Sequence, residues 1–447
     1  MREVIVISFS TCFCVERIVP MKLFYAFISY SFLTVGIGIT LGEANIAQAD
    51  SLIDTSQLER YGLTRPWFTQ VEMDRGRDQV ESVFFDGELI TVQTKRGVIQ
   101  AIDGETGKTV WVTHAGSPQL FTSPIGVGPQ HVAVVNGSHL FIFDRSNGKQ
   151  IWKRQLKGGV IGGPGLSKEY VFVPKVDGTL EAYSLSKPRD WENVRSIKDT
   201  QFSIWHYNSH GKTMVQPVVL NQTIGWANDR AQFYVAKLKP LQILFRVETF
   251  GNTVAPPAYI EGHFYLASVD GYLHKVHGTS GDIRWRFSTG ETLVNRPVAM
   301  DGFVYLTTAN GGLYRVLADE EVAKDRESEK KEEGGQAPMK EGKEVWFAPN
   351  ISQVLAVHSN KLFGMDRKGN LRVVDNESGK VLGTIPTHGI SIPLTNHIND
   401  RVYLVTSNGL VQCIRDINAV SPIIHDEKGK KAITKNDGEN EDPNDLE

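Results

Sequence analysis

The chain has 447 residues, of which 40% are hydrophobic and 22% are charged, and its formal net charge is −3. This balance is that of a large globular protein and gives no support to nucleic-acid binding, for which a clustered basic face would be expected. The 42 glycines favour a fold with many turns.

Residues 1–49 have the pattern of a secretory signal. Lys22 precedes a mostly apolar run over residues 23–41, and a small-x-small cleavage pattern follows at residues 47–49. We therefore predict export, with cleavage after Ala49. The alternative is an uncleaved membrane anchor, because a bilayer span needs only ~20 apolar residues.

Residues 1–20 lie ahead of this signal and are predicted to be an extension that precedes a true start at Met21. Cleavage of the signal would leave Cys413 as the one cysteine of the mature chain. An internal disulfide and a cysteine-based metal or redox site are then excluded. Cys413 lies in an apolar strand pattern, LVQCI, and is predicted to be a small core residue.

One unit recurs along the body of the chain, which we place at residues 50–424. It reads IQAIDGETGKTVW at residues 99–111 and returns at 141–152, 273–285 and 371–382. The unit has an alternating apolar strand, a polar turn with a glycine, and a tryptophan four residues after that glycine; the copy at 371–382 is weaker and lacks the tryptophan. We predict that the glycines take positive φ and that the tryptophans anchor neighbouring units. The residues assigned this structural role are Gly107, Trp111, Gly148, Trp152, Gly281, Trp285, Trp346 and Trp67.

The acidic residues of these turns also recur in register. Asp103, Asp144 and Asp375 follow the same strand of the unit. Asp side chains favour turns because they accept hydrogen bonds from nearby backbone N–H groups. We interpret these three residues as turn formers and not as catalytic acids.

The spacing of the hairpin glycines gives the period of the repeat. Gly97, Gly137 and Gly178 are separated by about 40 residues, and the same spacing returns later in the chain. A degenerate unit is predicted between Gly178 and Gly271, with strands TIGWA and QFYVAKL. Eight units of this length predict an all-β, eight-bladed β-propeller of four-stranded antiparallel blades.

Three further segments complete this organisation. The last unit lacks an outer strand, and we predict that the strand Trp67–Met73 supplies it and closes the ring. Residues 319–341 are rich in charge and read as a solvated insertion within one blade. Residues 425–447 carry eight acidic and four basic residues and are predicted to be a disordered acidic tail.

The repeat resembles that of the pyrroloquinoline-quinone-type (PQQ-like) propeller family. The resemblance is carried by GVIQAIDGETGKTVW at 97–111, DGTLEAYS at 177–184, DGYLHKVHGTSGDIRW at 270–285 and GNLRVVDNESGKVL at 369–382. One branch of that family contains quinone-dependent dehydrogenases. The other contains non-catalytic propellers similar to BamB, an accessory subunit of the outer-membrane β-barrel assembly machine.

The dehydrogenase branch implies calcium or a lanthanide, an Asp base, a stacked quinone and often an adjacent cysteine pair. This chain has no vicinal cysteine pair and no carboxylate-rich insertion. We therefore expect no cofactor and no catalysis, and place the chain in the BamB-like branch. A quinone-dependent dehydrogenase and a small-ligand sensor remain the alternatives.

The non-repeating connection at residues 185–212 is the candidate binding loop. It contains SIWHYNSHG, in which Trp205, His206, Tyr207 and His210 could contact a ligand or a partner. The resulting hypothesis is a monomeric scaffold in the periplasm or cell envelope that binds other envelope proteins. The only membrane contact expected is peripheral or through an uncleaved N-terminal segment.

Overall fold

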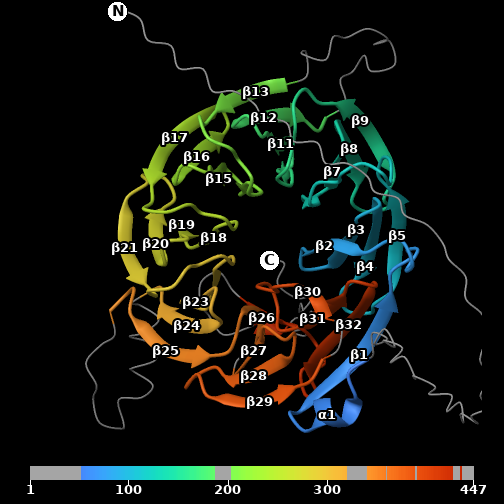
Figure 1. Cartoon of the computed structure of the whole chain (residues 1–447), viewed down its shortest axis with the longest axis vertical. Helices are drawn as coiled ribbons and strands as arrows, with labels where there is room; N and C mark the ends of the chain where they lie inside the picture. The colour runs from blue at the N-terminus through green and yellow to red at the C-terminus, as the bar shows by residue number, and fades with distance from the viewer. Residues whose placement is uncertain are drawn as a thin grey trace, which may run out of the picture. The chain divides into compact units, whose positions relative to one another are not determined.

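The computed structural model describes residues 52–186, 203–319, 340–358, 360–387 and 390–425, and the backbone of 433–434. The predicted signal at 1–49, most of the insertion at 319–341 and nearly all of the tail therefore lie outside the described residues. The unit Ala47–Glu447 contains eight four-stranded antiparallel sheets, which we call blades 1 to 8 (Figure 1). The predicted all-β propeller of eight blades is thus confirmed.

In blades 1 to 7 the strands run from the inside of the blade to its outside in chain order, and in blade 8 the outer strand is β1. Blades 1 to 4 are formed by β2 (Val80–Phe85), β3 (Leu89–Thr94), β4 (Val98–Asp103), β5 (Thr109–His114); β6 (Gly126–Val127), β7 (His131–Asn136), β8 (His139–Asp144), β9 (Gln150–Gln155); β10 (Gly165–Leu166), β11 (Tyr170–Pro174), β12 (Thr179–Ser184), β13 (Ser203–Asn208); and β14 (Val218–Val219), β15 (Thr223–Ala227), β16 (Gln232–Leu238), β17 (Leu241–Glu248). Blades 5 to 7 are formed by β18 (Ala258–Ile260), β19 (His263–Ala267), β20 (Tyr272–His277), β21 (Ile283–Ser288); β22 (Val298–Met300), β23 (Phe303–Thr307), β24 (Gly312–Leu317), β25 (Glu344–Pro349); and β26 (Gln353–Val357), β27 (Lys361–Met365), β28 (Leu371–Asp375), β29 (Val381–Ile385). Blade 8 contains β30 (Ile390–Pro393), β31 (Val402–Thr406), β32 (Leu410–Asp416) and β1 (Leu63–Gln70), and the remaining elements are α1 (Thr55–Glu59) and the short pair β33 (Ile423–Ile424) and β34 (Ile433–Thr434).

Burial explains why the strands of a blade differ in sequence. The middle strands are covered by the neighbouring blade on each face, so all six residues of β3 are buried and its sequence alternates little. The outer strands β13 and β21 alternate half-buried and exposed residues along their length. Their period of two is that of a strand with one solvated face.

Each hydrophobic cluster lies at a seam between two consecutive blades. At the seam between blades 1 and 2, Ile99 and Trp111 pack with Val132 and Phe141. Equivalent clusters occupy the other seven seams, including the one between blades 8 and 1, where Trp67 and Tyr403 pack with Phe85. The core is therefore a closed ring of eight layers.

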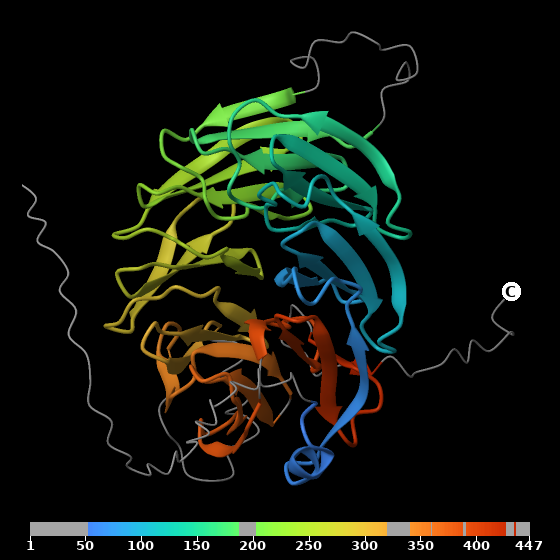
Figure 2. The same cartoon turned by 45° about the vertical axis from the view of Figure 1, so that its right-hand side comes forward.

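Ring closure by an N-terminal strand is confirmed. β1 pairs antiparallel with β32, with Leu63 opposite Asp416 and Trp67 opposite Cys413, and Figure 2 shows the blue strand beside the red ones. The strand begins earlier than the predicted Trp67 and has an irregularity between Thr64 and Trp67. Pro66 lies within this irregularity, and a proline has no N–H to donate to the strand ladder.

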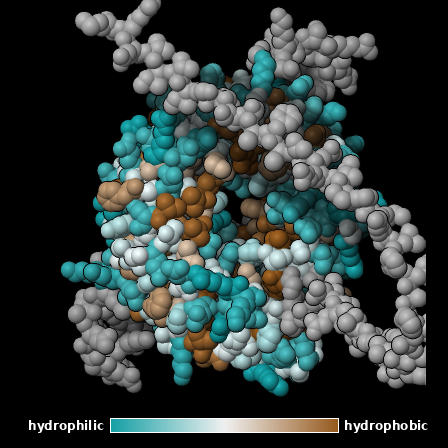
Figure 3. Space-filling view, in the orientation of Figure 1, coloured by the Kyte–Doolittle hydropathy of each residue, from teal (hydrophilic) through white to brown (hydrophobic). Residues whose placement is uncertain are grey.

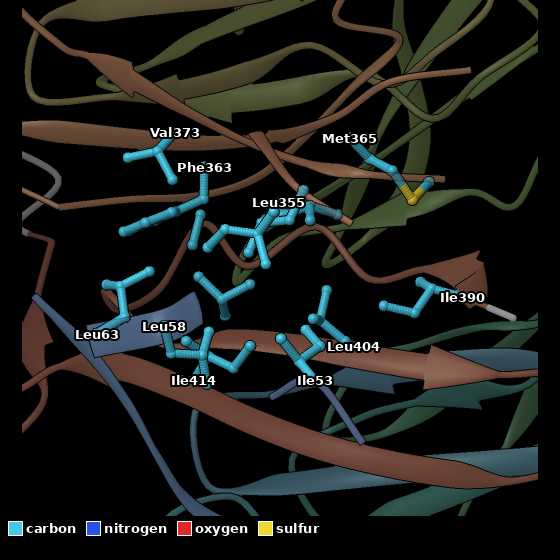
Figure 4. Packing of buried hydrophobic residues seen from close by; sticks show 14 residues of the cluster. Ile53, Leu58, Leu63, Leu355, Phe363, Met365, Val373, Ile390, Leu404 and Ile414 are labelled. Atoms are coloured by element: carbon cyan, nitrogen blue, oxygen red, sulfur yellow. The ribbon is translucent and has the colours of Figure 1, made fainter. Parts of the chain in front are cut away.

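The segment that precedes β1 seals the seam between blades 7 and 8. Leu58 of α1 and Leu63 of β1 pack with Phe363 and Ile414, as Figure 4 shows. At the outer-strand position where other blades carry a large aromatic side chain, blade 7 has Gly383. A Cβ added there would lie 2.1 Å from the Tyr61 hydroxyl oxygen. Tyr61, from the chain start, therefore occupies the space that the blade 7 strand leaves.

Two irregular units still form regular blades. The strands TIGWA and QFYVAKL, predicted for the degenerate unit, are confirmed as β15 and β16. In blade 6, which carries the insertion, the Ala318 carbonyl (2.7 Å) and Glu341 Oε2 (3.2 Å) both accept hydrogen bonds from the buried Lys275 Nζ of blade 5. Ala318 precedes the insertion and Glu341 is its last residue, so one lysine of the preceding blade holds both ends of the insertion. No helix in the described part of the chain is long and apolar enough to cross a membrane.

Candidate functional site

The recurring turns and tryptophans form the contacts between blades. Asp103 Oδ1 accepts hydrogen bonds from the N–H groups of Glu105 (3.2 Å) and Thr106 (2.7 Å), which is the geometry of a turn former. Gly107 has a φ of 70°. A Cβ added to it would lie 2.5 Å from the ring of Trp67, which comes from the preceding blade.

The same arrangement continues around the ring. Trp111 lies against Gly148 of the next blade, and its Nε1 donates to the Arg145 carbonyl (2.8 Å). Trp346 lies against Gly379 in the same way. The remaining predicted anchors have other contacts. Trp152 is buried at the seam of blades 2 and 3, and Trp285 lies against Gly342. Gly281 lies against the Phe245 ring and not against a tryptophan.

The predicted binding loop is wrong as a structural assignment. Trp205, His206 and Tyr207 lie on β13, the outer strand of blade 3, and only His210 lies in a connection. Trp205 has the register position of the anchoring tryptophans and contacts Trp226 edge-on, with ring centroids 6.3 Å apart. The alternation in SIWHYN is a strand pattern, and it was missed because no turn glycine precedes it.

The structure therefore separates the four candidates. Trp205 and Tyr207 are half-buried against blade 4, and His206 is exposed on the outer edge. His210 is exposed in the connection between β13 and β14, with a φ of 55°, and its N–H donates to Asn208 Oδ1 (2.7 Å). They do not form one site.

A different set of residues forms a shared surface. Five consecutive connections between an outer strand and the next inner strand each present an exposed apolar side chain, and each of these residues lies three positions ahead of a proline. We call this set the apolar arc: Phe121 (58% exposed), Ile161 (41%), Met214 (53%), Val254 (47%) and Val294 (41%).

Topology places the whole arc on one face. Strands alternate in direction within each antiparallel blade, so every connection from an outer strand to the next inner strand leaves the ring at the same face. Blades 2 to 6 are consecutive, so their five residues follow one another around the ring. Hydrophobic residues border the central opening on the face seen in Figure 3.

The opposite face differs in character. Within the described residues of blades 1 to 6, none of the turns at that face carries an exposed large hydrophobic side chain. Scattered exposed apolar residues are normal on a protein surface, whereas exposed apolar residues that gather on one face indicate an interaction site. The asymmetry between the faces therefore identifies the arc as the candidate binding surface.

Phe250 and Leu120 extend this surface. Phe250 is 71% exposed and lies in the same connection as Val254. Its ring contacts the Arg286 guanidinium (5.0 Å to the centroid) and the Tyr272 ring (6.0 Å). The aromatic side chain is thus held in place while its outer face remains available, as in the anchor residues of protein interfaces.

The recurring acids act as turn formers. Asp144 and Asp375 each accept hydrogen bonds from their own turns, and these bonds lower the pKa of both carboxyls. The described residues contain no group of three or more His, Cys, Asp or Glu side chains that could hold a metal ion.

Sequence reasoning missed the arc, although a signal was present. Each residue of the arc lies three positions before a proline, but a single apolar residue in a connection matches no strand or turn pattern. Segments between strands are usually polar, so an apolar residue recurring there in register indicates a surface that is kept apolar.

Solved structures of low sequence identity share the fold. BamB from Moraxella catarrhalis matches with a TM-score of 0.59 and 14% identity, covering 79% of this chain and 97% of that one. The computationally designed Ika8 protein matches with a TM-score of 0.55 and 13% identity, covering 77% and 98%. Both support the propeller architecture alone.

Two curated relatives match about half of the chain. Tetrathionate hydrolase from Acidithiobacillus ferrooxidans is 25% identical over 246 residues, which are 50% of this chain and 48% of that protein. The outer membrane protein assembly factor BamB of Yersinia pestis is 19% identical over 260 residues, covering 53% and 63%. The chain thus spans less than two thirds of the length of either relative.

A family model described as outer membrane protein assembly factor BamB matches residues 95–223 and 218–324, which together are just over half of the chain. With its repeated turns and its eight blades, this protein belongs to the BamB family of PQQ-like β-propellers.

Proposed function

We propose that this protein is an exported, non-catalytic scaffold that binds a component of outer-membrane protein assembly through the apolar arc. The observation that carries the proposal is the recurrence of one exposed apolar side chain on the same face in five consecutive connections, without a large exposed counterpart in the described turns of the opposite face of blades 1 to 6. Family membership supports the choice of partner, because the family model and the Yersinia pestis relative are both described as outer membrane protein assembly factors.

The structure of the arc suits a rigid docking surface. Each residue lies in a short connection between two strands of the ring, so little backbone ordering is needed on binding. Met214 and Val254 come from adjacent connections, and Phe250 adds an aromatic anchor beside them. Burying such side chains against a partner is favourable by about 25 cal/mol per Å² of apolar surface.

Export is proposed from the sequence. The apolar run over 23–41 and the small-x-small pattern at 47–49 have the form of a secretory signal. A chain carrying that signal would reach the periplasm, where outer-membrane proteins are assembled. Fractionation of cells that express the full chain would test this step, and recovery in the cytosol would contradict it.

Charge placed on the arc tests the docking surface. The double variant Met214→Asp/Val254→Asp should lose co-purification with outer-membrane assembly components, because burying two carboxylates in an apolar interface is unfavourable. Its thermal midpoint should stay near that of the parent, since both side chains are exposed.

A matched control uses residues of similar exposure elsewhere. The double variant Val110→Asp/Leu382→Asp changes side chains that are 47% and 48% exposed on outer strands. It should retain the partner. Equal loss in both variants, or retention in the arc variant, would contradict the proposal.

The absence of catalysis is proposed and separately testable. Calcium and quinone added to the purified chain should give no dye reduction with alcohols or sugars, and tetrathionate should not be consumed. The second assay is included because one relative is a tetrathionate hydrolase. Clear turnover in either assay would replace the scaffold with an enzyme.

A further inference from the structure

Blade 5 departs from the repeat at the turn between β20 and β21. His277 has the register position of the recurring turn acids, which are Asp103, Asp144 and Asp375. The Ser280 N–H donates to His277 Nδ1 (3.3 Å), so the imidazole replaces the carboxylate as the acceptor of the turn. This role uses Nδ1 and leaves Nε2 free for another.

A second histidine lies directly opposite on the neighbouring strand. His263 begins β19 and pairs in register with His277, the last residue of β20. Their ring centroids are 5.3 Å apart, and their ring planes are inclined by 76°. Both residues are half-buried, and they lie at the face of the ring opposite the apolar arc, where the β18–β19 and β20–β21 turns are found. Solvent therefore has access to a pair of facing imidazoles.

Backbone contacts fix the spacing of the two histidines. The turn that precedes His263 has positive φ at both of its residues, 48° at Glu261 and 77° at Gly262, which is the pattern of a two-residue type I′ hairpin. The Gly278 N–H, directly after His277, donates to the Gly262 carbonyl (2.7 Å) and joins the two turns. The pair is thus preorganised by the fold.

Hydrogen bonds at Nδ1 leave Nε2 of each ring available. The Glu261 carbonyl lies 2.8 Å from His263 Nδ1, and because a carbonyl can only accept, this nitrogen carries the proton in the neutral ring. The lone pair of the neutral His263 then lies on Nε2. Ser280 Oγ lies 3.0 Å from His277 Nδ1 and donates its own proton to Asp282 Oδ2 (2.6 Å). That hydroxyl can accept from a protonated Nδ1, so His277 can also present the lone pair of Nε2, with loss of the longer contact from the Ser280 N–H.

The protonation state of His263 suits a metal ligand. Burial lowers its pKa, and the positive charges of Lys275, His277 and Arg284 lower it further, against the opposite effect of its backbone hydrogen bond. His263 is therefore neutral near pH 7, which is the form that coordinates metals. Lys275 itself is paired with Glu341 (3.2 Å).

The ring spacing agrees with tetrahedral coordination. Imidazole nitrogens bind zinc at about 2.0–2.1 Å, so two imidazoles on one tetrahedral ion have their ring centroids about 5 Å apart. The value for His263 and His277 is 5.3 Å before any ion is added.

We propose that His263 and His277 form a two-ligand site for a divalent transition metal of the zinc or copper class, bound through the two Nε2 atoms. Imidazole suits these ions, whereas calcium and magnesium prefer oxygen ligands. Since the described residues offer no group of three such side chains, water would fill the remaining positions. The coordination sphere is then open to a side chain of a partner. The site lies on the face opposite the arc and does not depend on the scaffold function.

Zinc titration of the full chain tests the site. Isothermal titration calorimetry with zinc chloride, on protein stripped of metal and held near pH 7.5, should show a site in the parent that His263→Gln weakens at least about tenfold. His277→Asn should weaken it equally. Its amide oxygen can still accept from the turn, so the thermal midpoint without metal should stay near that of the parent.

A control and a second probe keep the test specific. His206→Gln removes an exposed histidine from β13 and should leave the zinc affinity unchanged. With Cu²⁺ as the probe, electron paramagnetic resonance of the parent should show coupling to two imidazole nitrogens, and His263→Gln should reduce this to one. Equal zinc affinity in the parent and in the double variant His263→Gln/His277→Asn would overturn the proposal. A parent that binds neither ion would overturn it as well.

Discussion

Replacing Trp67 with alanine removes the anchor of the closing strand. Trp67 is 8% exposed, and its Nε1 donates to the Gly104 carbonyl of blade 1 (3.1 Å). Trp→Ala at a buried site costs about 3–5 kcal/mol. The Gly104 carbonyl keeps the hydrogen bond from the Tyr403 hydroxyl (3.2 Å), and loss of the second bond, from Trp67, adds about 1 kcal/mol. We therefore expect Trp67→Ala to lower the free energy of unfolding by about 4–6 kcal/mol.

The neighbouring residue supplies the control. Phe68 lies on the same strand but is 56% exposed, so Phe68→Ala should change stability by less than about 1 kcal/mol. Urea denaturation followed by tryptophan fluorescence and by circular dichroism measures both variants. If the two substitutions have equal effects, or if Trp67→Ala costs less than about 1 kcal/mol, closure by β1 does not stabilise the ring as argued.

Two further predictions concern the turns and His397. Gly148 and Gly262 both have positive φ, but a Cβ at Gly148 would lie 2.5 Å from the Trp111 ring and a Cβ at Gly262 would contact nothing. In urea denaturation, Gly148→Ala should therefore lower the free energy of unfolding by about 1–3 kcal/mol more than Gly262→Ala does. Equal losses in the two variants would refute the ring contact. The pKa of His397 is about 3 in the folded chain and about 6.5 in the unfolded chain, so the unfolded chain takes up the proton first as the pH decreases. The free energy of unfolding should therefore fall between about pH 6.5 and pH 3 in chloride buffer, by up to about 1.4 kcal/mol per pH unit. His397→Gln should flatten that slope, and an unchanged slope would contradict the assignment.

Most of the fold could be predicted from the sequence because each blade repeats the same local chemistry. The alternating strand, the Asp-capped turn and the glycine are local features, and they were sufficient to place β15 and β16 even in the degenerate unit. Closure by the strand around Trp67 also followed from the repeat, since the last unit lacked an outer strand. Its start at Leu63 did not, because that boundary depends on pairing with Asp416.

The remaining features depend on contacts between distant residues. Tyr61 fills the space above Gly383, and no local pattern links two positions so far apart in the chain. The apolar arc becomes a surface only when the ring places five connections on one face. The ion pair of His425 with Asp301 is similar, because it joins the C-terminal segment to a turn of blade 6.

Site-specific photo-crosslinking in cells tests the central claim, that the arc is the docking surface of an envelope scaffold. A photoreactive side chain placed at Met214 should crosslink to an outer-membrane assembly component. The same group at Lys149, which lies in an exposed turn of the opposite face, should not. Crosslinks of equal yield at both positions, or at Lys149 alone, would contradict the account.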